Sequence, residues 1–436
     1  MQAGIPQLDS PHGFRPRHAP SRPLKPAAML TAVLLLSGCD PRTDLTSESP
    51  KTPETHLTAQ VKAAPAEPGA APRTFAQIAA LPDEQFDVAE AVLALGAESR
   101  PDIDIGATLQ ALDAMAAKAR ADLPENPDGT DYFDGLYEFV LDRRAASPFR
   151  EDRAEDYDLS FTVLKHRGSC LSTGIMALAV ARRIGAPVWG VQCPAHFFLR
   201  YIPPEDRKAG VKEKTKQNQN KSKHKDIPLN FDATRPMPEN WQKLDDDFYR
   251  NLLHLDSHAE ANGAYLRPLT DRETVSAFLS SRSGYFAMKK DFEHSYNDAS
   301  RALALNPNNI TGCINAGLAL ESLKRYDEAE QAYAHALRID SNYVKALNNL
   351  AYLKVRDPES SVYSPRSAEK LIETALKRDP DRAYLHATEG EVKAAGGDWR
   401  AAARAMDQAA RMEPKNKQYR ARFLYFRSQL RGETGQ

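Results

Sequence analysis

A repeated pattern in the C-terminal third of this 436-residue chain restricts its fold more than any other feature of the sequence. The segments "LNPNN", "IDSNY", "RDPDR" and "MEPKN" place Pro307, Ser341, Pro380 and Pro414 at spacings of 34, 39 and 34 residues. A period of 34 residues is typical of a unit made of two helices and a turn. Because one such unit cannot bury its apolar face alone, we expect the units to stack into an all-helical solenoid.

Small and aromatic residues recur at fixed positions inside each unit, as close packing of two helices requires. They are Gly317, Tyr326, Ala329, Tyr333 and Ala336 in the second unit, and Gly390, Trp399, Ala402, Met406 and Ala409 in the fourth. The first unit is less regular, with Ser295 at a small position, and we place five extra residues of the third in "DPESSVYSP". The pattern resembles the tetratricopeptide repeat. We predict four repeats over residues 272–415, followed by a capping helix and tail over 416–436.

Solenoids of this kind usually bind an extended peptide or another protein in their concave groove. Asn315, Asn348 and Asn349 lie on the predicted first helices of their units, where the groove would form. They either contact a bound segment or are ordinary solvent-facing polar residues. The tyrosines and leucines at helical spacing are interpreted as packing between helices and are assigned to no site.

The first 39 residues have the layout of a bacterial export signal. Basic residues precede the apolar run 27–38, which is shorter than the ~20 residues that a membrane-spanning helix needs but suits a signal-peptide core. The ending "LSGC" resembles the bacterial lipobox, which implies that Cys39 is lipid-modified after cleavage. The alternative is an ordinary cleaved signal with an incidental Cys39. The long basic stretch also suggests a start codon downstream of Met1.

These features predict a protein tethered by lipid in the bacterial cell envelope, on the periplasmic face. Asp40, which follows the lipobox cysteine, resembles the retention signal of enterobacterial lipoproteins, which implies the inner membrane rather than the outer one. Residues 40–73 contain six prolines and no aromatic residue. Such a segment cannot bury enough apolar surface to offset the entropy of ordering, so we predict a flexible linker.

The charge balance argues against a nucleic-acid partner, because the formal net charge is −1. The lysine-rich segment 206–226 is interpreted as a solvated loop, since no aromatic residue is interleaved with its charges. A contact for an anionic partner is the alternative. No cysteine or histidine pair has metal-ligand spacing, and no glycine-rich phosphate loop is found. We therefore predict no metal and no cofactor.

The region 74–268 reads as a mixed α+β domain. Apolar residues recur at helical spacing in "FDVAEAVLALGAE" and "ATLQALDAMAAKARADL", and the segment 171–185 is an apolar helix with Gly185 as its C-cap. The segments "VWGVQC", "HFFLRYI" and "PLNFDAT" are rich in β-branched or aromatic residues and predict strands. The expected architecture is this α+β domain followed by the all-α solenoid.

Cys170 is the first candidate for chemistry. It follows "HRGS" and directly precedes the apolar helix, so its thiol lies where unpaired N–H groups and the helix dipole stabilise a thiolate. The same N–H groups can bind a developing oxyanion. Once Cys39 is assigned to lipid, Cys170, Cys193 and Cys313 remain, and an odd number of thiols leaves at least one unpaired.

His196 and Asp232 complete a possible activated nucleophile. His196 begins the second strand-like run, inside an apolar sequence where a buried imidazole needs hydrogen-bond partners. One ring nitrogen could face Cys170, and the other could face the carboxylate of Asp232 on the next predicted strand. The simpler interpretations are a structural cysteine, a core histidine and an aspartate in a turn.

Residues 76 to 245 resemble the SirB-type branch of the transglutaminase-like superfamily through the pattern "RGxC…ARRxGxP…GV…P(G/A)HFxxR". The resemblance implies a papain-like fold, which commonly carries C-terminal tetratricopeptide repeats. It also implies Cys170 as nucleophile, His196 as general base and acid, and Asp232 as the residue that orients the imidazole. Many members have proline at the position of Cys170. This chain departs from the pattern at Ala195, where glycine is usual, and in "DATRPM", which replaces "DPFNGG".

Two functions are consistent with these residues. The first is a membrane-tethered cysteine hydrolase or acyltransferase that acts on amide bonds of a protein or peptide recruited by the repeats. The second is a non-catalytic adaptor lipoprotein that uses the repeats for protein binding. Cys193 is a less favoured nucleophile because its strand position lacks the helix dipole. A reversible disulfide between Cys170 and Cys193 is a further hypothesis.

Overall fold

The computed structural model describes residues 72–140, 158–165, 168–193, 196–203, 228–231, 245–253, 260, 263 and 265–433. Several predicted features lie outside these residues: the signal peptide with Cys39, nearly all of the linker, the lysine-rich segment and Asp232. Within the described part of the chain, no helix is both long and apolar enough to cross a membrane.

The N-terminal part of the described chain is helical, as predicted. Its helices are α2 (Phe75–Ala79), the short 3-10 helix η1 (Asp83–Gln85), α3 (Val88–Ser99), α4 (Ile105–Ala121), α5 (Gly129–Val140), α6 (Leu159–Lys165) and α7 (Cys170–Ile184). Side-chain caps explain several helix starts. Asp87 accepts the amides of Ala89 and Glu90 at the start of α3, and Asp104 accepts the amide of Ala107 at the start of α4.

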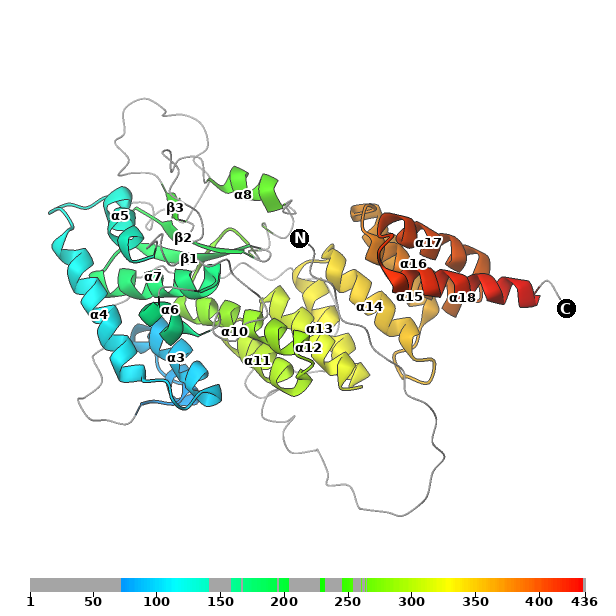
Figure 1. Ribbon diagram of the computed structural model, residues 1–436, viewed down its shortest axis with the longest axis horizontal. Helices are drawn as coiled ribbons and strands as arrows, with labels where there is room; N and C mark the ends of the chain where they lie inside the picture. Colours follow the sequence, from blue (N-terminus) through cyan, green and yellow to red (C-terminus); the bar gives the residue numbers. More distant parts are fainter. Residues whose placement is uncertain are drawn as a thin grey trace, which may run out of the picture. The chain divides into compact units, whose positions relative to one another are not determined.

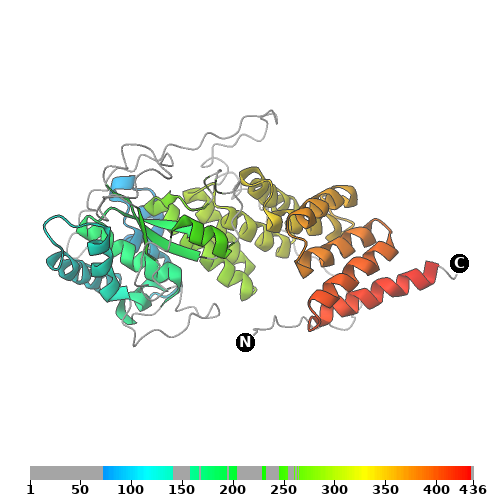
Figure 2. The ribbon, with the colours of Figure 1, turned by 90° about the horizontal axis from the view of Figure 1, so that it is seen from above.

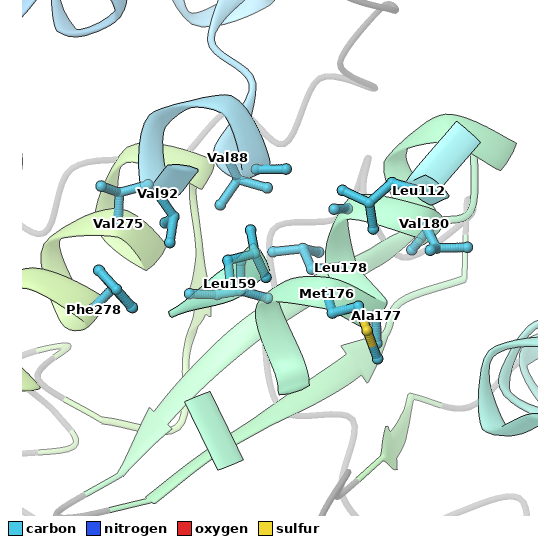
Figure 3. Close-up of a cluster of buried hydrophobic side chains, with 14 of the residues drawn as sticks. Val88, Val92, Leu112, Leu159, Met176, Ala177, Leu178, Val180, Val275 and Phe278 are labelled. Carbon is cyan, nitrogen blue, oxygen red and sulfur yellow. The ribbon is translucent and has the colours of Figure 1, made fainter. Parts of the chain in front are cut away.

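Helix α7 is the buried centre of this domain. All residues from Leu171 to Ala181 are buried, which fits a sequence that is apolar or small on every face. Gly185 ends the helix with φ of 74°, a left-handed conformation that confirms it as the C-cap. In Figure 3, residues of α7 such as Met176 and Leu178 lie among side chains from α3, α4, α6 and α10.

One antiparallel sheet packs against α7. Its strands are β1 (Val188–Cys193), β2 (His196–Tyr201), β3 (Leu229–Phe231) and β4 (Pro268–Leu269), in the order β3-β2-β1-β4. Gly174 of α7 and Gly190 of β1 make room for Phe197, because a Cβ at either position would lie 2.6–2.7 Å from that ring. Odd-numbered residues of β2 therefore face α7, and even-numbered residues face the other side.

Helix α8 (Asp246–Leu253) covers the second face of the sheet. Phe198 of β2 packs there with Val191 and Cys193 of β1 and with Tyr249 of α8. Figure 1 shows α7 and α8 on opposite sides of β1 and β2. The two faces of β2 thus contact different elements, and this decides how the candidate site is built.

The C-terminal part consists of paired helices, as the repeat predicted (Figures 1 and 2). They are α10 (Asp271–Met288), α11 (Phe292–Leu305), α12 (Ile310–Ser322), α13 (Tyr326–Ile339), α14 (Val344–Arg356), α15 (Pro365–Arg378), α16 (Ala383–Ala395), α17 (Trp399–Met412) and α18 (Lys417–Glu433). The connection 357–364 between α14 and α15 holds the extra residues of the third repeat. Gly317 of α12 lies against the ring of Tyr333 in α13, as close helix packing requires.

Helix α10 belongs to the first repeat and also to the core of the α+β domain. Its residues Val275, Phe278 and Leu279 join the core around α7. Arg282 forms a buried ion pair with Asp298 of α11 and donates a hydrogen bond to the carbonyl of Leu95 in α3. The α+β domain and the first repeat therefore pack directly against each other across the boundary predicted between residues 268 and 272.

Candidate functional site

Cys170 is the first residue of α7, where the sequence placed it. Ser169 and Ser172 form a capping box: Ser172 donates its backbone N–H to Ser169 Oγ at 3.0 Å, and Ser169 donates its own to Ser172 Oγ at 2.8 Å. The first N–H groups of a helix have no acceptor within that helix. The amides of Cys170 and Leu171 are therefore available to a negative charge beside the thiol.

The described cysteines differ in exposure. Cys170 is partly exposed, whereas Cys193 is 1% exposed and Cys313 is fully buried. Burial raises the pKa of the Cys193 thiol to about 12 and that of the Cys313 thiol to about 12. Both are therefore protonated near neutral pH, which argues against Cys193 as the nucleophile. All three are free thiols in this structure.

His196 lies on the face of the sheet that points away from α7. It is the first residue of β2 and pairs with Cys193 across the β1–β2 hairpin. The ring centroid of His196 lies 5.8 Å from that of Tyr249 and 6.3 Å from that of Phe198. Cys170 instead packs against the core that contains Phe197, on the α7 side.

Cys170 and His196 therefore come from the expected elements, α7 and β2, and the described ring contacts of His196 lie on the α8 side of the sheet. Cys193 packs with Tyr249 of α8, whereas Cys170 packs against the core around α7, so this geometry gives no support to the hypothesis of a reversible disulfide between them. Sequence spacing alone could not reveal this, because a shift of one residue reverses the face on which every side chain lies.

Asp232 lies outside the described residues, but the strand that leads to it is described. That strand, β3, ends at Phe231 and pairs with β2, with Leu199 opposite Phe231 and Arg200 opposite Asn230. The expectation that the strand before Asp232 lies next to the strand of His196 is thus confirmed. The role of Asp232 stays a prediction.

Arg200 is a residue of the site to which the sequence analysis gave no role, although it is the arginine of the quoted pattern "HFxxR". It lies on the His196 face of β2 and is 8% exposed. Its guanidinium donates from Nε to Asn230 Oδ1 at 2.8 Å, from Nη1 to the carbonyl of Leu266 at 2.8 Å, and from Nη2 to Asp246. An arginine inside the apolar run "HFFLRY" was the available signal, because a buried guanidinium requires partners.

The repeat region presents exposed apolar side chains on the helices predicted to line the groove. Leu318 of α12 and Tyr352 of α14 are each 39% exposed. Asn315 is used inside the array, since it donates to the carbonyl of Ser280 at 2.7 Å. Asn348 donates to Asn349 Oδ1 at 3.3 Å, while its own side-chain oxygen has no hydrogen-bond partner among the described residues.

The central part of the chain matches a known family. Residues 106–217 match the model of the transglutaminase-like superfamily. This range contains α7, β1 and β2, and hence both Cys170 and His196.

Other relatives match short stretches of the chain. The peroxisomal targeting signal receptor of Saccharomyces cerevisiae is 30% identical over 125 residues, which are 27% of this chain and 20% of that protein. The heat shock protein sti1 homolog of Schizosaccharomyces pombe is 30% identical over 82 residues, which are 19% of this chain and 14% of that protein. The chain thus spans a fifth or less of the length of these curated relatives.

Solved structures give only distant similarities. MamA from Desulfovibrio magneticus is 14% identical, with a TM-score of 0.31 over 35% of this chain and 84% of that one. A thermophilic TPR protein from Thermus thermophilus is 15% identical, with a TM-score of 0.32 over 35% and 80%.

Proposed function

From the premise that residues 106–217 are a transglutaminase-like domain, followed by an array of tetratricopeptide-like helical pairs, we propose that Cys170 is the nucleophile of an acyl-transfer reaction. The substrate would be an amide bond in a protein or peptide segment that the repeats recruit. The observation that carries this proposal is the position of Cys170, partly exposed at the start of a capped and buried helix.

The proposed reaction has two steps. Cys170 Sγ attacks the amide carbonyl carbon, and the tetrahedral oxyanion is held by the amides of Cys170 and Leu171. The carbon–nitrogen bond then breaks, and the amine leaves with the proton that His196 took from the thiol. Water or a second amine attacks the thioester, its proton passes to His196, and Cys170 is released. Hydrolysis and transfer differ only in this second nucleophile.

A non-catalytic adaptor is the second candidate, and one observation favours it. The His196 ring lies on the Tyr249 side of the sheet, whereas proton transfer requires it within hydrogen-bond reach of Cys170. In the adaptor, the α+β domain would be a scaffold for the repeats.

Alkylation of the folded protein with iodoacetamide between pH 5 and 9 separates the two candidates. If the protein is an enzyme, we expect the rate at which iodoacetamide modifies Cys170 to rise with a midpoint below pH ~7. We expect His196→Ala to move that midpoint up to an ordinary value near ~8.5. Cys193 and Cys313 should stay unmodified, because their pKa values of about 12 keep them protonated. A midpoint near ~8.5 in both proteins would leave only the adaptor. Denatured protein, in which all thiols react, is the control.

The repeats offer a docking face for an uncharged extended segment. Two arginines near Tyr352 are paired, since Arg356 binds Glu321 at 2.6 Å and Arg422 binds Glu391 at 2.5 Å. Tyr352 is 39% exposed. Paired charges leave the tyrosine ring as the main source of affinity. To test whether Tyr352 binds the segment, a random peptide library is selected on the full chain and counter-selected on Tyr352→Ala. Peptides that bind both proteins equally would contradict this role of Tyr352.

Lipid attachment at Cys39 completes the proposal and would hold the protein at the bacterial envelope, with the inner membrane favoured. The support is the lipobox-like sequence "LSGC". Bacteria fed an alkyne-tagged fatty acid are expected to label the wild type and not Cys39→Ser. Equal labelling of the two proteins would remove this part.

A further inference from the structure

Arg200 connects three described segments near His196. Its three donor positions reach Asn230 on β3, the carbonyl of Leu266 before β4, and Asp246 at the start of α8. Arg200 itself lies on the same strand and the same face as His196, four residues further along. A single buried guanidinium thus ties two strands, one loop and one helix together. Such a pattern uses the fixed fork of an arginine, which a lysine ammonium does not have.

Helix α8 links Arg200 to the imidazole of His196, because it carries both Asp246 and Tyr249. Asp246 and Tyr249 lie three residues apart and hence on one face of α8. The Tyr249 ring stacks on Phe198 with centroids 4.1 Å apart and an interplanar angle of 5°. It also stacks on His196 with centroids 5.8 Å apart and an angle of 28°. Tyr249 is fully buried, so its ring cannot shift unless α8 moves.

We propose that Arg200 is a positioning residue for His196: by binding Asp246 it fixes α8, and through Tyr249 it fixes the plane of the imidazole. By binding Asn230 it also fixes the strand that leads to Asp232. The proposal rests on the proposed function only in giving His196 a catalytic role. The position of the ring can be tested without any substrate.

The test observes the ring carbon-bound protons of His196 by NMR in full-length protein with labelled histidine, assigned with His196→Ala. Tyr249→Leu provides the reference, because it removes the ring current of the stacked tyrosine. Arg200→Lys is expected to move the His196 signals in the same direction, because a lysine ammonium cannot hold Asp246, Asn230 and the Leu266 carbonyl at once in the geometry of the guanidinium. Asp246→Asn should do so to a smaller extent, and it keeps the test valid if Arg200→Lys does not fold.

Arg282→Lys is the matched control. Arg282 is as buried as Arg200, at 7% against 8% exposed, and also binds one carboxylate and one backbone carbonyl, but it lies in the first repeat. The Arg282→Lys substitution should lower the stability of the protein and leave the His196 signals unchanged. Unchanged His196 signals in both Arg200→Lys and Asp246→Asn would overturn the proposal, as would equal shifts in Arg282→Lys.

Cys170 alkylation in the same variants separates this proposal from the proposed function. If Arg200→Lys moves the His196 signals and also the midpoint of Cys170 alkylation, both stand. If the signals move but the midpoint stays, Arg200 positions His196 and the catalytic role of His196 fails. If the signals stay, the positioning role fails whatever the alkylation shows.

Discussion

Arg282→Ala is expected to lower the free energy of unfolding by about 3–5 kcal/mol, the cost of leaving a buried charge without its partner. Arg282 and Asp298 are 9% and 3% exposed at their side chains, and their two hydrogen bonds measure 2.6 and 2.8 Å. The same guanidinium donates to Leu95 of α3 at 2.8 Å. The substitution therefore leaves a buried carboxylate and a buried carbonyl without this donor. Urea denaturation followed by circular dichroism measures the loss.

Arg301→Ala is the control for this prediction. Arg301 of α11 binds Glu98 of α3 at 2.6 Å and thus joins the same two regions, but its side chain is 31% exposed and that of Glu98 is 40% exposed. Water screens such a pair, so its loss should cost at most ~1 kcal/mol. If the two substitutions cost the same, the buried guanidinium of Arg282 contributes no more to stability than an exposed ion pair does. Arg282→Met with Asp298→Leu should recover part of the loss.

Gly317→Ala is expected to destabilise the second repeat by about 1–3 kcal/mol, although alanine is the better helix former. A Cβ at this position would lie 2.3 Å from Cε1 and 2.6 Å from Cδ1 of Tyr333. The ring cannot withdraw freely, because Tyr333 is fully buried and its hydroxyl donates to Glu321 at 3.1 Å. Thermal denaturation measured on the full chain should show a lower midpoint.

Gly284→Ala is the matched comparison on helix α10. There the nearest atom to an added Cβ is Asn315 Nδ2 at 3.6 Å, an ordinary contact. The substitution should therefore be neutral or stabilise by up to about 1 kcal/mol through helix propensity. A similar gain at Gly317 would show that α12 and α13 are not packed as closely as this structure has them.

The elements of the fold followed from local signals in the sequence. The 34-residue period, the small residues within each unit and the five extra residues predicted the paired helices and the long connection 357–364. Gly185 predicted the end of α7, and the β-branched runs predicted β1 and β2. These signals are readable because helix caps, turns and periodicity depend on residues close together in the chain.

The site was only partly readable. Cys170 at the start of α7 and His196 at the start of β2 were placed correctly as positions in the chain. The side of the sheet on which His196 lies was not, and neither was the part played by Arg200. The hydrogen-bond partners of Arg200 lie 30, 46 and 66 positions away in the chain, so no local sequence pattern predicts them.

The sequence by itself determined which segments are helices and strands, where the repeats lie, and which thiol begins a helix. Tertiary structure alone decided that α10 contributes to the α+β core, that Tyr249 of α8 stacks on the imidazole, and that His196 lies on the face of β2 that points away from α7. The physical reason is one of range. Local conformation is set by neighbours in the chain, whereas the surroundings of a side chain are set by which distant surfaces are buried together.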